Sequence, residues 1–556
     1  MNYRCRVKRY FGLIIPYSIS NSFTMKRLHS KYLGLIVLLI AVAVLIVSLF
    51  VIYSPVLEHT GGIIAYPVDD AYIHLAIAKN LAIHHIWGVS PYEFSSSSSS
   101  ILYPILLAAV FMSTGVHIGT PLFLNAIIAI LFLSILQRWL VRQMLTPLQQ
   151  LVVLLAAVFL IPLPPLVQCG MEHTLQLLFY FLFVYSIADA LEHREMSIPW
   201  KVYVYGALFT ATRYESMAVI AIACLFLLFY RRWVPAFLLG TISFLPVLIF
   251  GLYARSKGSD FLPNSVLLKS AMPSLTFDGL YSYFTDDFGM RLFKGDIYNT
   301  FATQRLLFLL PLTYLLFLRH TVQRPAYRYI LILLMVASLL HVSLMLYSLS
   351  PRYEAALIGS SVIICLTILL KNTPLPFYRP LSGPEWIKVL LACFIVAPIV
   401  LRGWNAFERA SLASICIYDQ QVQMGRFAQE FYDRDAIAIN DIGAVSYFAH
   451  GHNLDLWGLS DVDIARSRRK HYNSPDFLDS LSHRRQVKIA IVFEQPFHDL
   501  LKRWSRMASW TIPYNNASYS KTVFFYAVDP AEEQRLSSSL KEFQPSLPKG
   551  VIVNYY

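Results

Sequence analysis

Charged residues are scarce in this sequence. Asp, Glu, Lys and Arg make up 14% of its 556 residues, whereas hydrophobic residues make up 56%. Because a soluble protein of this length would carry about a quarter charged residues, the composition excludes an ordinary soluble globular protein. Cysteine is scarce too. The six cysteines are scattered, mostly in apolar stretches, and their spacing predicts no disulfide framework.

Metal-ligand patterns are also lacking. The pairs His84–His85 and His450/His452 resemble metal-binding pairs, but neither has a third ligand at a suitable spacing. We therefore predict no metal site and no certain cofactor, with a divalent cation left open.

Long apolar runs are what the sequence has instead. Several approach the roughly 20 residues needed to span a bilayer, as in Tyr32–Tyr53, so we predict a multi-pass membrane protein. That first run reads as a retained anchor, because it is too long for a cleaved signal and no cleavage motif follows. Met25 offers an alternative start. The net charge of +13 then reflects topology signals and contacts with anionic membrane lipids, not nucleic acid.

Eleven stretches are candidate transmembrane helices, and together they predict a helical membrane domain over residues 32–402. Ile101–Gly115 is short for a span, so we expect it to lie along the membrane within a first outer loop over 55–118. The candidate spans are about 32–54, 119–137, 149–166, 173–190, 199–212, 214–230, 233–253, 305–319, 326–348, 352–370 and 387–402.

The distribution of Lys and Arg predicts the orientation. With residues 1–31 in the cytoplasm, nineteen of these side chains fall in inner segments and eight in outer loops. Counting Ile101–Gly115 as a span would move Arg138 and Arg142 outside and spoil this asymmetry. The positive-inside rule therefore predicts that the C-terminus is extracytoplasmic. We expect the protein to lie in the plasma (inner) membrane.

The sequence changes character at about residue 403. It becomes polar and rich in Asp, Arg and His, and the strand-like runs AIAIN, NLDLWGL, VKIAIVF and TVFFYAV are separated by helical and turn patterns. We predict a separate soluble α/β or α+β domain over residues 403–556, on the outer face.

Polar residues embedded in apolar sequence gather on that predicted outer face. Ionisable groups beside apolar spans are costly unless they face a polar cavity or pair with each other. Their coincidence on one side therefore predicts a hydrophilic pocket. The candidate residues are Asp69, Asp70, Glu172, Arg213, Glu215, Asn264, Lys269, Arg352 and Tyr353.

Each cluster also has a purely structural interpretation. The Asp69–Asp70 pair could cap a helix, and Arg213 with Glu215 could form a local ion pair. Lys269 could be solvated, and Arg352 could anchor the end of a span. The serine run over 95–100 is most simply a flexible linker that caps the following helix.

The order and the sequences of these clusters resemble those of the GT-C superfamily of membrane glycosyltransferases. The resemblance is greatest to its arabinofuranosyltransferase-like branch, which has a C-terminal extracytoplasmic domain. The stretches that carry the resemblance run in order from residue 69 to residue 466. They are DDAYIHLAIAKNLA, SSSSSILYPILLA, GMEHTLQLL, TRYESMAVIA, DFLPNSVLLKS, SPRYEAAL and AINDIGAVSYFAHGHNLDLWGLSDVDIAR.

The resemblance implies a sugar donor on a polyprenyl phosphate, transfer with inversion on the outer face, and a glycan or glycolipid acceptor of the cell envelope. It also implies that the first outer loop holds two helices along the membrane, which correspond to Ala71–Ile86 and Ile101–Gly115. An acceptor hydroxyl must lose a proton as it attacks, so Asp69 is our candidate base, with Asp70 orienting the acceptor or completing the site. Cations must stabilise the leaving phosphate. The candidates for the phosphate are Arg352, Lys269 and Arg213, and those for other substrate contacts are Glu172, Glu215, Asn264 and Tyr353.

Two other functions compete with this one. A transporter or flippase of lipid-linked sugars should carry ionisable groups at mid-membrane, broken helices in paired positions and internal repeats. The sequence instead places its charges at the outer ends of spans and adds a large outer domain. A non-catalytic envelope assembly protein would look much like a glycosyltransferase in sequence. Convergence of the acidic and basic candidates on one cavity would favour the enzyme.

Overall fold

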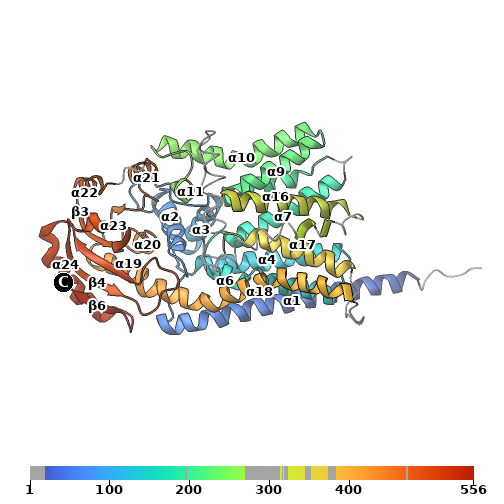
Figure 1. Cartoon of the computed structure of the whole chain (residues 1–556), viewed down its shortest axis with the longest axis horizontal. Helices are drawn as coiled ribbons and strands as arrows, with labels where there is room; N and C mark the ends of the chain where they lie inside the picture. The colour runs from blue at the N-terminus through green and yellow to red at the C-terminus, as the bar shows by residue number, and fades with distance from the viewer. Residues whose placement is uncertain are drawn as a thin grey trace, which may run out of the picture.

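A bundle of long helices and a sheet domain lie at opposite ends of the long axis of the molecule, with the first-loop helices between them (Figure 1). The computed structural model describes residues 19–193, 197–269, 313–315, 317–318, 324–344, 352–372, 383–470 and 474–556. The bundle helices are α1 (Ile19–Thr60), α4 (Thr120–Arg142), α5 (Pro147–Leu160), α6 (Leu163–Gln168), α7 (His173–Glu192), α8 (Trp200–Thr212), α9 (Ser216–Phe229), α10 (Trp233–Ser256), α16 (Pro325–Leu344), α17 (Ala355–Asn372) and α18 (Gly383–Ile417).

These helices occupy the stretches that hydropathy predicted, with two differences. The expected span over 149–166 is divided between α5 and α6, because prolines at positions 162, 164 and 165 interrupt the backbone hydrogen bonds of a continuous helix. The expected span over 305–319 lies largely outside the described residues.

The described helices differ in their suitability to cross a membrane. By length and composition, four of them qualify: Tyr32–Thr60, Thr120–Arg142, His173–Glu192 and Trp233–Ser256. Five shorter apolar helices accompany them. The protein is thus a helical multi-pass membrane protein, whereas the count of eleven spans stays a prediction.

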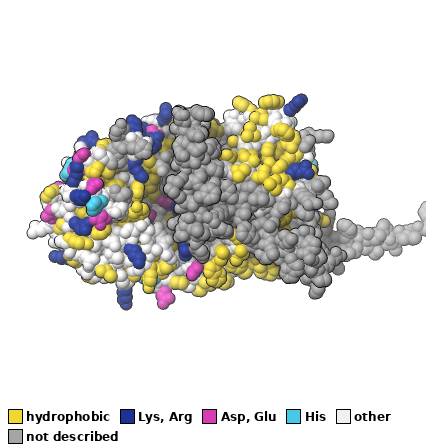
Figure 2. All heavy atoms as spheres, in the orientation of Figure 1, with side chains coloured by type: hydrophobic (Ala, Val, Ile, Leu, Met, Phe, Trp, Pro, Cys, Tyr) yellow, Lys and Arg dark blue, Asp and Glu magenta, His cyan; other side chains and the backbone are white. Residues whose placement is uncertain are grey.

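The surface of the molecule changes along its long axis. Hydrophobic side chains cover the described surface over the bundle, and charged side chains gather over the sheet domain (Figure 2). Large apolar side chains such as Phe229, Trp233 and Phe237 are 65–80% exposed. Exposure of this kind costs nothing where the neighbouring solvent is lipid, so the bundle surface suits a bilayer.

The first loop contains two helices, α2 (Asp70–His84) and α3 (Leu102–Thr114). The short helix α11 (Asn264–Lys269), farther along the chain, lies in the same region. The first two pack against each other, and α2 also packs against the sheet domain. With 13 residues, α3 is about 20 Å long and too short to cross an apolar layer of about 30 Å. Its placement along a membrane surface stays a prediction.

The C-terminal domain is a six-stranded mixed sheet in the order β2-β1-β3-β5-β4-β6, with helices on both faces. Strands β2, β1 and β3 are parallel, and the remaining neighbours are antiparallel. The strands are β1 (Ala436–Ile439), β2 (Asn453–Asp455), β3 (Val487–Val492), β4 (Ser505–Thr511), β5 (Thr522–Ala527) and β6 (Ile552–Tyr555). The helices are α19 (Gln423–Phe431), α20 (Gly443–Phe448), α21 (Val462–Arg469), α22 (Pro475–Arg484), α23 (Glu494–Leu501) and α24 (Glu533–Phe543), with short helical turns at Tyr418–Val422, Pro530–Glu532 and Gln544–Ser546.

The two parts of the chain are joined by more than a linker. Helix α18 runs without a break through residue 403, where the sequence placed the domain boundary. Ile73 and Ile77 of α2 belong to the same buried apolar cluster as Ile437 and Ile439 of β1. An ion pair between Arg466 of α21 and Asp260, which follows α10, adds a second contact at 3.0 Å. The sheet domain is therefore held against the first loop.

Candidate functional site

A cavity of about 470 Å³ lies where the first loop, the bundle and the sheet domain meet. Half of its lining residues come from α2, α7, α9, α16 and α17, and Leu459 of the sheet domain also lines it. Its polar lining residues are Asp70, His74, Ser97, Ser98, Ser99, Gln176, Tyr180, Arg213, Tyr214, Glu215, Ser216, Ser265, His341, Tyr353 and Glu354.

An ion pair between Asp70 and Arg352 joins the first turn of α2 to the segment that precedes α17. The Arg352 guanidinium donates to Asp70 Oδ2 at 2.8 Å, and the two side chains are 10% and 23% exposed. Arg352 also donates to the Tyr353 hydroxyl at 3.2 Å and contacts Met171 Sδ at 2.9 Å. Arg352 thus holds Asp70, which lines the cavity.

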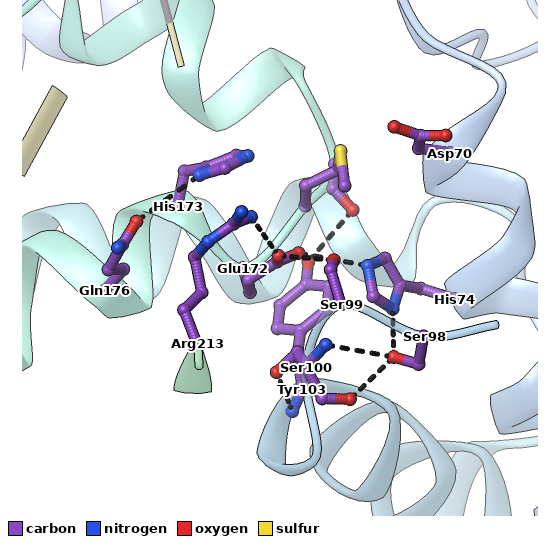
Figure 3. A network of polar contacts seen from close by, with 12 residues as sticks. Asp70, His74, Ser98, Ser99, Ser100, Tyr103, Glu172, His173, Gln176 and Arg213 are labelled. Carbon is purple, nitrogen blue, oxygen red and sulfur yellow. Dashed lines mark hydrogen bonds and ion pairs between the residues drawn. The ribbon is translucent and has the colours of Figure 1, made fainter. Parts of the chain in front are cut away.

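Glu172 is the centre of a second polar network (Figure 3). Its carboxylate is fully buried and accepts from Arg213 at 2.6 Å and from the Ser99 hydroxyl at 2.8 Å. His74 Nε2 lies 3.0 Å from the other carboxylate oxygen. The three partners come from α2, the serine run and the α8–α9 turn. Glu172 itself does not line the cavity, so the structure places this predicted substrate-binding residue behind the wall, where it holds residues that do.

Arg213 is already neutralised by two carboxylates. Besides its contact with Glu172, its guanidinium donates to both oxygens of Glu215, at 2.6 and 3.0 Å. The local ion pair between Arg213 and Glu215 that the sequence allowed is therefore present. The ring of Tyr353 lies between the two guanidiniums, with its centroid 5.2 Å from that of Arg213 and 5.0 Å from that of Arg352.

The serine run is a buried wall segment and not a flexible linker. The side chains of Ser97 and Ser98 are 3% exposed, and Ser100 is 1% exposed. The Ser98 hydroxyl donates to the Ser100 carbonyl at 2.6 Å and lies 3.4 Å from His74 Nδ1. The linker interpretation is wrong because these hydroxyls find partners inside the fold. The expectation that the run caps the following helix is correct, since the Ser100 hydroxyl accepts from the Tyr103 amide in the first turn of α3.

Several polar groups that line the cavity have no hydrogen-bond partner among the described residues. They are the hydroxyls of Tyr180, Tyr214, Ser216 and Ser265 and one carboxylate oxygen of Glu354. All five side chains are buried. Because burying an unsatisfied polar group costs about 1–3 kcal/mol, such a concentration is expected where a polar ligand completes the hydrogen bonds.

Asp69 faces away from this cavity. Its carboxylate accepts from the amides of Gly443 and Ala444, at 2.6 and 2.8 Å, at the start of α20. It makes no side-chain cap on its own helix, so the expected cap on α2 is wrong for this residue. Burial and the nearby Asp441 carboxylate raise the pKa of Asp69 above its ordinary value, whereas the two amides oppose that shift.

The remaining predicted residues have mixed outcomes. Asn264 is fully buried at the start of α11, and its side-chain amide has no partner in the part of the chain that the structure describes. Its neighbour Ser265 lines the cavity, but Asn264 does not. The side chain of Lys269 lies outside the described residues. No group of three or more metal-ligating side chains is present in the described ranges.

Sequence reasoning missed several lining residues, of which His74 is the clearest. It lies four residues after Asp70, and positions four apart share one face of a helix, so this spacing could have identified it. Tyr180 and His341 lie within apolar spans, where nothing in the local pattern distinguishes them from ordinary core residues.

Comparison with solved structures identifies the class of fold. The chain is similar to ArnT from Cupriavidus metallidurans, solved bound to undecaprenyl phosphate, with 10% sequence identity and a TM-score of 0.52 over 89% of this chain and 98% of ArnT. An oligosaccharyltransferase from Archaeoglobus fulgidus, solved without ligand, is similar at 12% identity and a TM-score of 0.49, over 94% and 76% of the two chains. The chain therefore shares the fold of ArnT, and this is the GT-C fold that the sequence resemblance implied.

Sequence comparisons reach only part of the chain. A family described as a domain of unknown function (DUF8728) matches residues 411–526, which cover most of the sheet domain. No curated protein matches the sequence. The arabinofuranosyltransferase-like branch stays a prediction.

Proposed function

We propose that this protein is a membrane glycosyltransferase that moves a sugar from a polyprenyl-phosphate donor to a glycan or glycolipid acceptor on the outer face of the plasma membrane. The observation that carries the proposal is Asp70, which lines a cavity with unpartnered polar groups and pairs with Arg352 behind the lining. ArnT has a similar fold and was solved with undecaprenyl phosphate, which supports a donor of this kind here.

The cavity has the size and lining for a sugar phosphate. Ligand pockets measure about 300–1,000 Å³, and this one has about 470 Å³. The hydroxyls of Tyr180, Ser216 and Ser265 can donate to or accept from the hydroxyls of a sugar. They are the groups we propose for sugar contacts, together with the Glu215 carboxylate and Tyr353, two of the residues selected from the sequence. Asn264 and Glu172 do not line the cavity, so we propose that they support the residues that do.

Arg352 is the favoured ligand for the donor phosphate. Phosphate accepts charge-assisted hydrogen bonds, and the charge that develops on the leaving group needs a cation in place. Among the described residues, Arg352 forms an ion pair with one carboxylate, that of Asp70, whereas Arg213 forms ion pairs with two. A second cation at Lys269 remains part of the proposal from the sequence.

Asp70 is the favoured general base. A base must reach the acceptor hydroxyl within hydrogen-bond distance, and Asp70 lines the cavity. The sequence favoured Asp69, but both oxygens of Asp69 are engaged by the α20 amides. Attack of the acceptor oxygen on the anomeric carbon would break the bond to the donor phosphate in one step, with inversion. The acceptor proton would pass to Asp70 and the negative charge to the phosphate beside Arg352.

Incubation of the purified full-length protein with a panel of polyprenyl-phosphate sugars tests the proposal. We expect one member of the panel to be transferred or slowly hydrolysed, and undecaprenyl phosphate to accumulate. Loss of a general base costs about 100- to 10,000-fold in rate, so Asp70→Asn should abolish most turnover while the protein still binds the donor. Gly240→Ala is the matched control, because the added methyl group meets only Cys224 Sγ at 3.8 Å.

Two results would contradict the proposal. Movement of the lipid-linked sugar across a vesicle membrane without cleavage would indicate a transporter. Turnover in Asp70→Asn within threefold of the wild type, far inside the loss of about 100-fold expected at the least, would remove Asp70 from the role of base.

A further inference from the structure

The sheet domain contacts the chain next to the proposed base. Asp69 immediately precedes Asp70, and its carboxylate accepts from two consecutive amides of the sheet domain. Asp69 is an extension of the first turn of α2, with φ −65° and ψ −30°. Displacement of Asp69 must therefore displace Asp70, because the two share a peptide bond in a helical turn.

Gly443 allows the start of α20 to approach the start of α2 this closely. A Cβ atom at position 443 would lie 2.0 Å from the backbone oxygen of Asp69 and 2.7 Å from its Oδ2. The nearest atom belongs to the backbone, so no rotation of a side chain can relieve the overlap. A residue larger than glycine would push α20 away from the start of α2.

The same face of α2 makes further contacts with α20. The Lys79 ammonium donates to the Tyr447 carbonyl and lies 5.4 Å from the centre of the Tyr447 ring. The rings of Tyr72 and Tyr447 are 6.2 Å apart. These contacts extend along α2 from Asp69 to Lys79, so α20 fixes the direction of the helix as well as its first residue.

We propose that Asp69 is a positioning residue through which the sheet domain aims Asp70 into the cavity. Residues 411–526, which match the family of unknown function, include α20. Under this proposal they help to complete the site through α20, and Leu459 also lines the cavity. This inference rests on the proposed function for its catalytic consequence, but the contact itself can be tested without turnover.

Hydrogen exchange of the full-length protein tests the contact. In Gly443→Ala, the amides of residues 70–76 should exchange about 10- to 100-fold faster than in the wild type, the change expected when a charge-assisted hydrogen bond is lost. The same amides in Gly240→Ala should be unchanged, and so should those of α4 in both variants. Unchanged exchange of residues 70–76 in Gly443→Ala would overturn the proposal, whatever the activity of the protein.

Turnover of a polyprenyl-phosphate sugar tests the catalytic consequence. Gly443→Ala and Asp69→Ala should each lose about tenfold or more, and the double variant should lose little more than either, because residues in contact are not additive. The acid limb of the pH–rate profile should persist in Asp69→Asn, since Asp70 would still be the base. Disappearance of that limb in Asp69→Asn would make Asp69 the base and overturn the proposal.

The failures of the two proposals can be told apart. If the wild type turns over no donor in the panel, the proposed function fails, and the exchange experiment still decides whether α20 holds α2. If the wild type is active and Gly443→Ala is fully active, the positioning role fails while the glycosyltransferase proposal stands.

Discussion

Replacement of Glu172 by glutamine would separate a buried structural carboxylate from a substrate contact. Glutamine keeps the shape of the side chain and one oxygen acceptor for Arg213 and Ser99. It removes the negative charge and turns an amide NH₂ toward His74 Nε2, which lies 3.0 Å from the carboxylate. Removing one partner of a buried ion pair costs about 3–5 kcal/mol. We expect the lower end, because Arg213 keeps both contacts to Glu215.

Glu215→Gln is the matched control. It removes a charge from the same guanidinium, but the Glu215 side chain is 26% exposed and that of Glu172 is fully buried. Because solvent screens the exposed side of the Glu215 carboxylate, we expect a smaller loss in this variant, of about 1 kcal/mol. One kcal/mol corresponds to about 2–4 °C in the melting midpoint, an upper bound here because the conversion comes from smaller proteins. Glu172→Gln should therefore lower the midpoint by about 6–12 °C, and Glu215→Gln should lower it by about 2–4 °C.

Tryptophan fluorescence of the detergent-solubilised protein during heating measures both midpoints, and donor turnover is measured on the same samples below the transition. A Glu172→Gln protein as stable as the wild type but inactive would refute the reasoning. That result would mean that the carboxylate contacts substrate, as the sequence alone suggested, and that the network around it contributes little to stability.

Three further predictions concern other parts of the molecule. Burial lowers the pKa of Lys79 to about 8. Between pH 8 and about 10.4 the unfolded chain therefore binds more protons than the folded protein, so the free energy of unfolding rises with pH in that window. The melting midpoint should rise accordingly in the wild type, and Lys79→Met should lack this rise. Arg352→Ala should raise the KM for a polyprenyl-phosphate sugar about 10- to 100-fold through loss of a charge-assisted contact, and an unchanged KM would exclude Arg352 from phosphate binding. A reporter fused after Tyr556 should read extracytoplasmic and one inserted after Gln143 cytoplasmic, and the same side for both would contradict the topology.

Hydropathy was sufficient to locate the bundle helices, because the cost of exposing backbone polar groups in lipid allows few structures other than helices. In the sheet domain, the strand-like runs AIAIN, NLDLWGL, VKIAIVF and TVFFYAV correspond to β1, β2, β3 and β5. Strands β4 and β6 were missed. Residues 505–511 read SRMASWT, with few β-branched residues, and residues 552–555 form a short edge strand. Both are strands because of their neighbours and not because of local propensity.

The serine run shows the same limit at the site. Composition alone favours a linker, since serine is typical of flexible segments. The run is buried because Glu172, His74 and the start of α3 supply partners for its hydroxyls. Those partners are distant in the sequence or depend on the direction of a helix, and no pattern within six serines can reveal them.

The choice between Asp69 and Asp70 depends on geometry that adjacent residues in a sequence conceal. Successive residues in a helix point about 100° apart, so two neighbouring acids at the start of α2 can meet different parts of the structure. Asp70, Ile73 and His74 line the cavity, and their spacing of three and four residues is that of a single helix face. Asp69 is off that face and meets α20 instead. A tandem pair of acids can therefore serve two purposes, with Asp70 lining the cavity and Asp69 holding the sheet domain through α20.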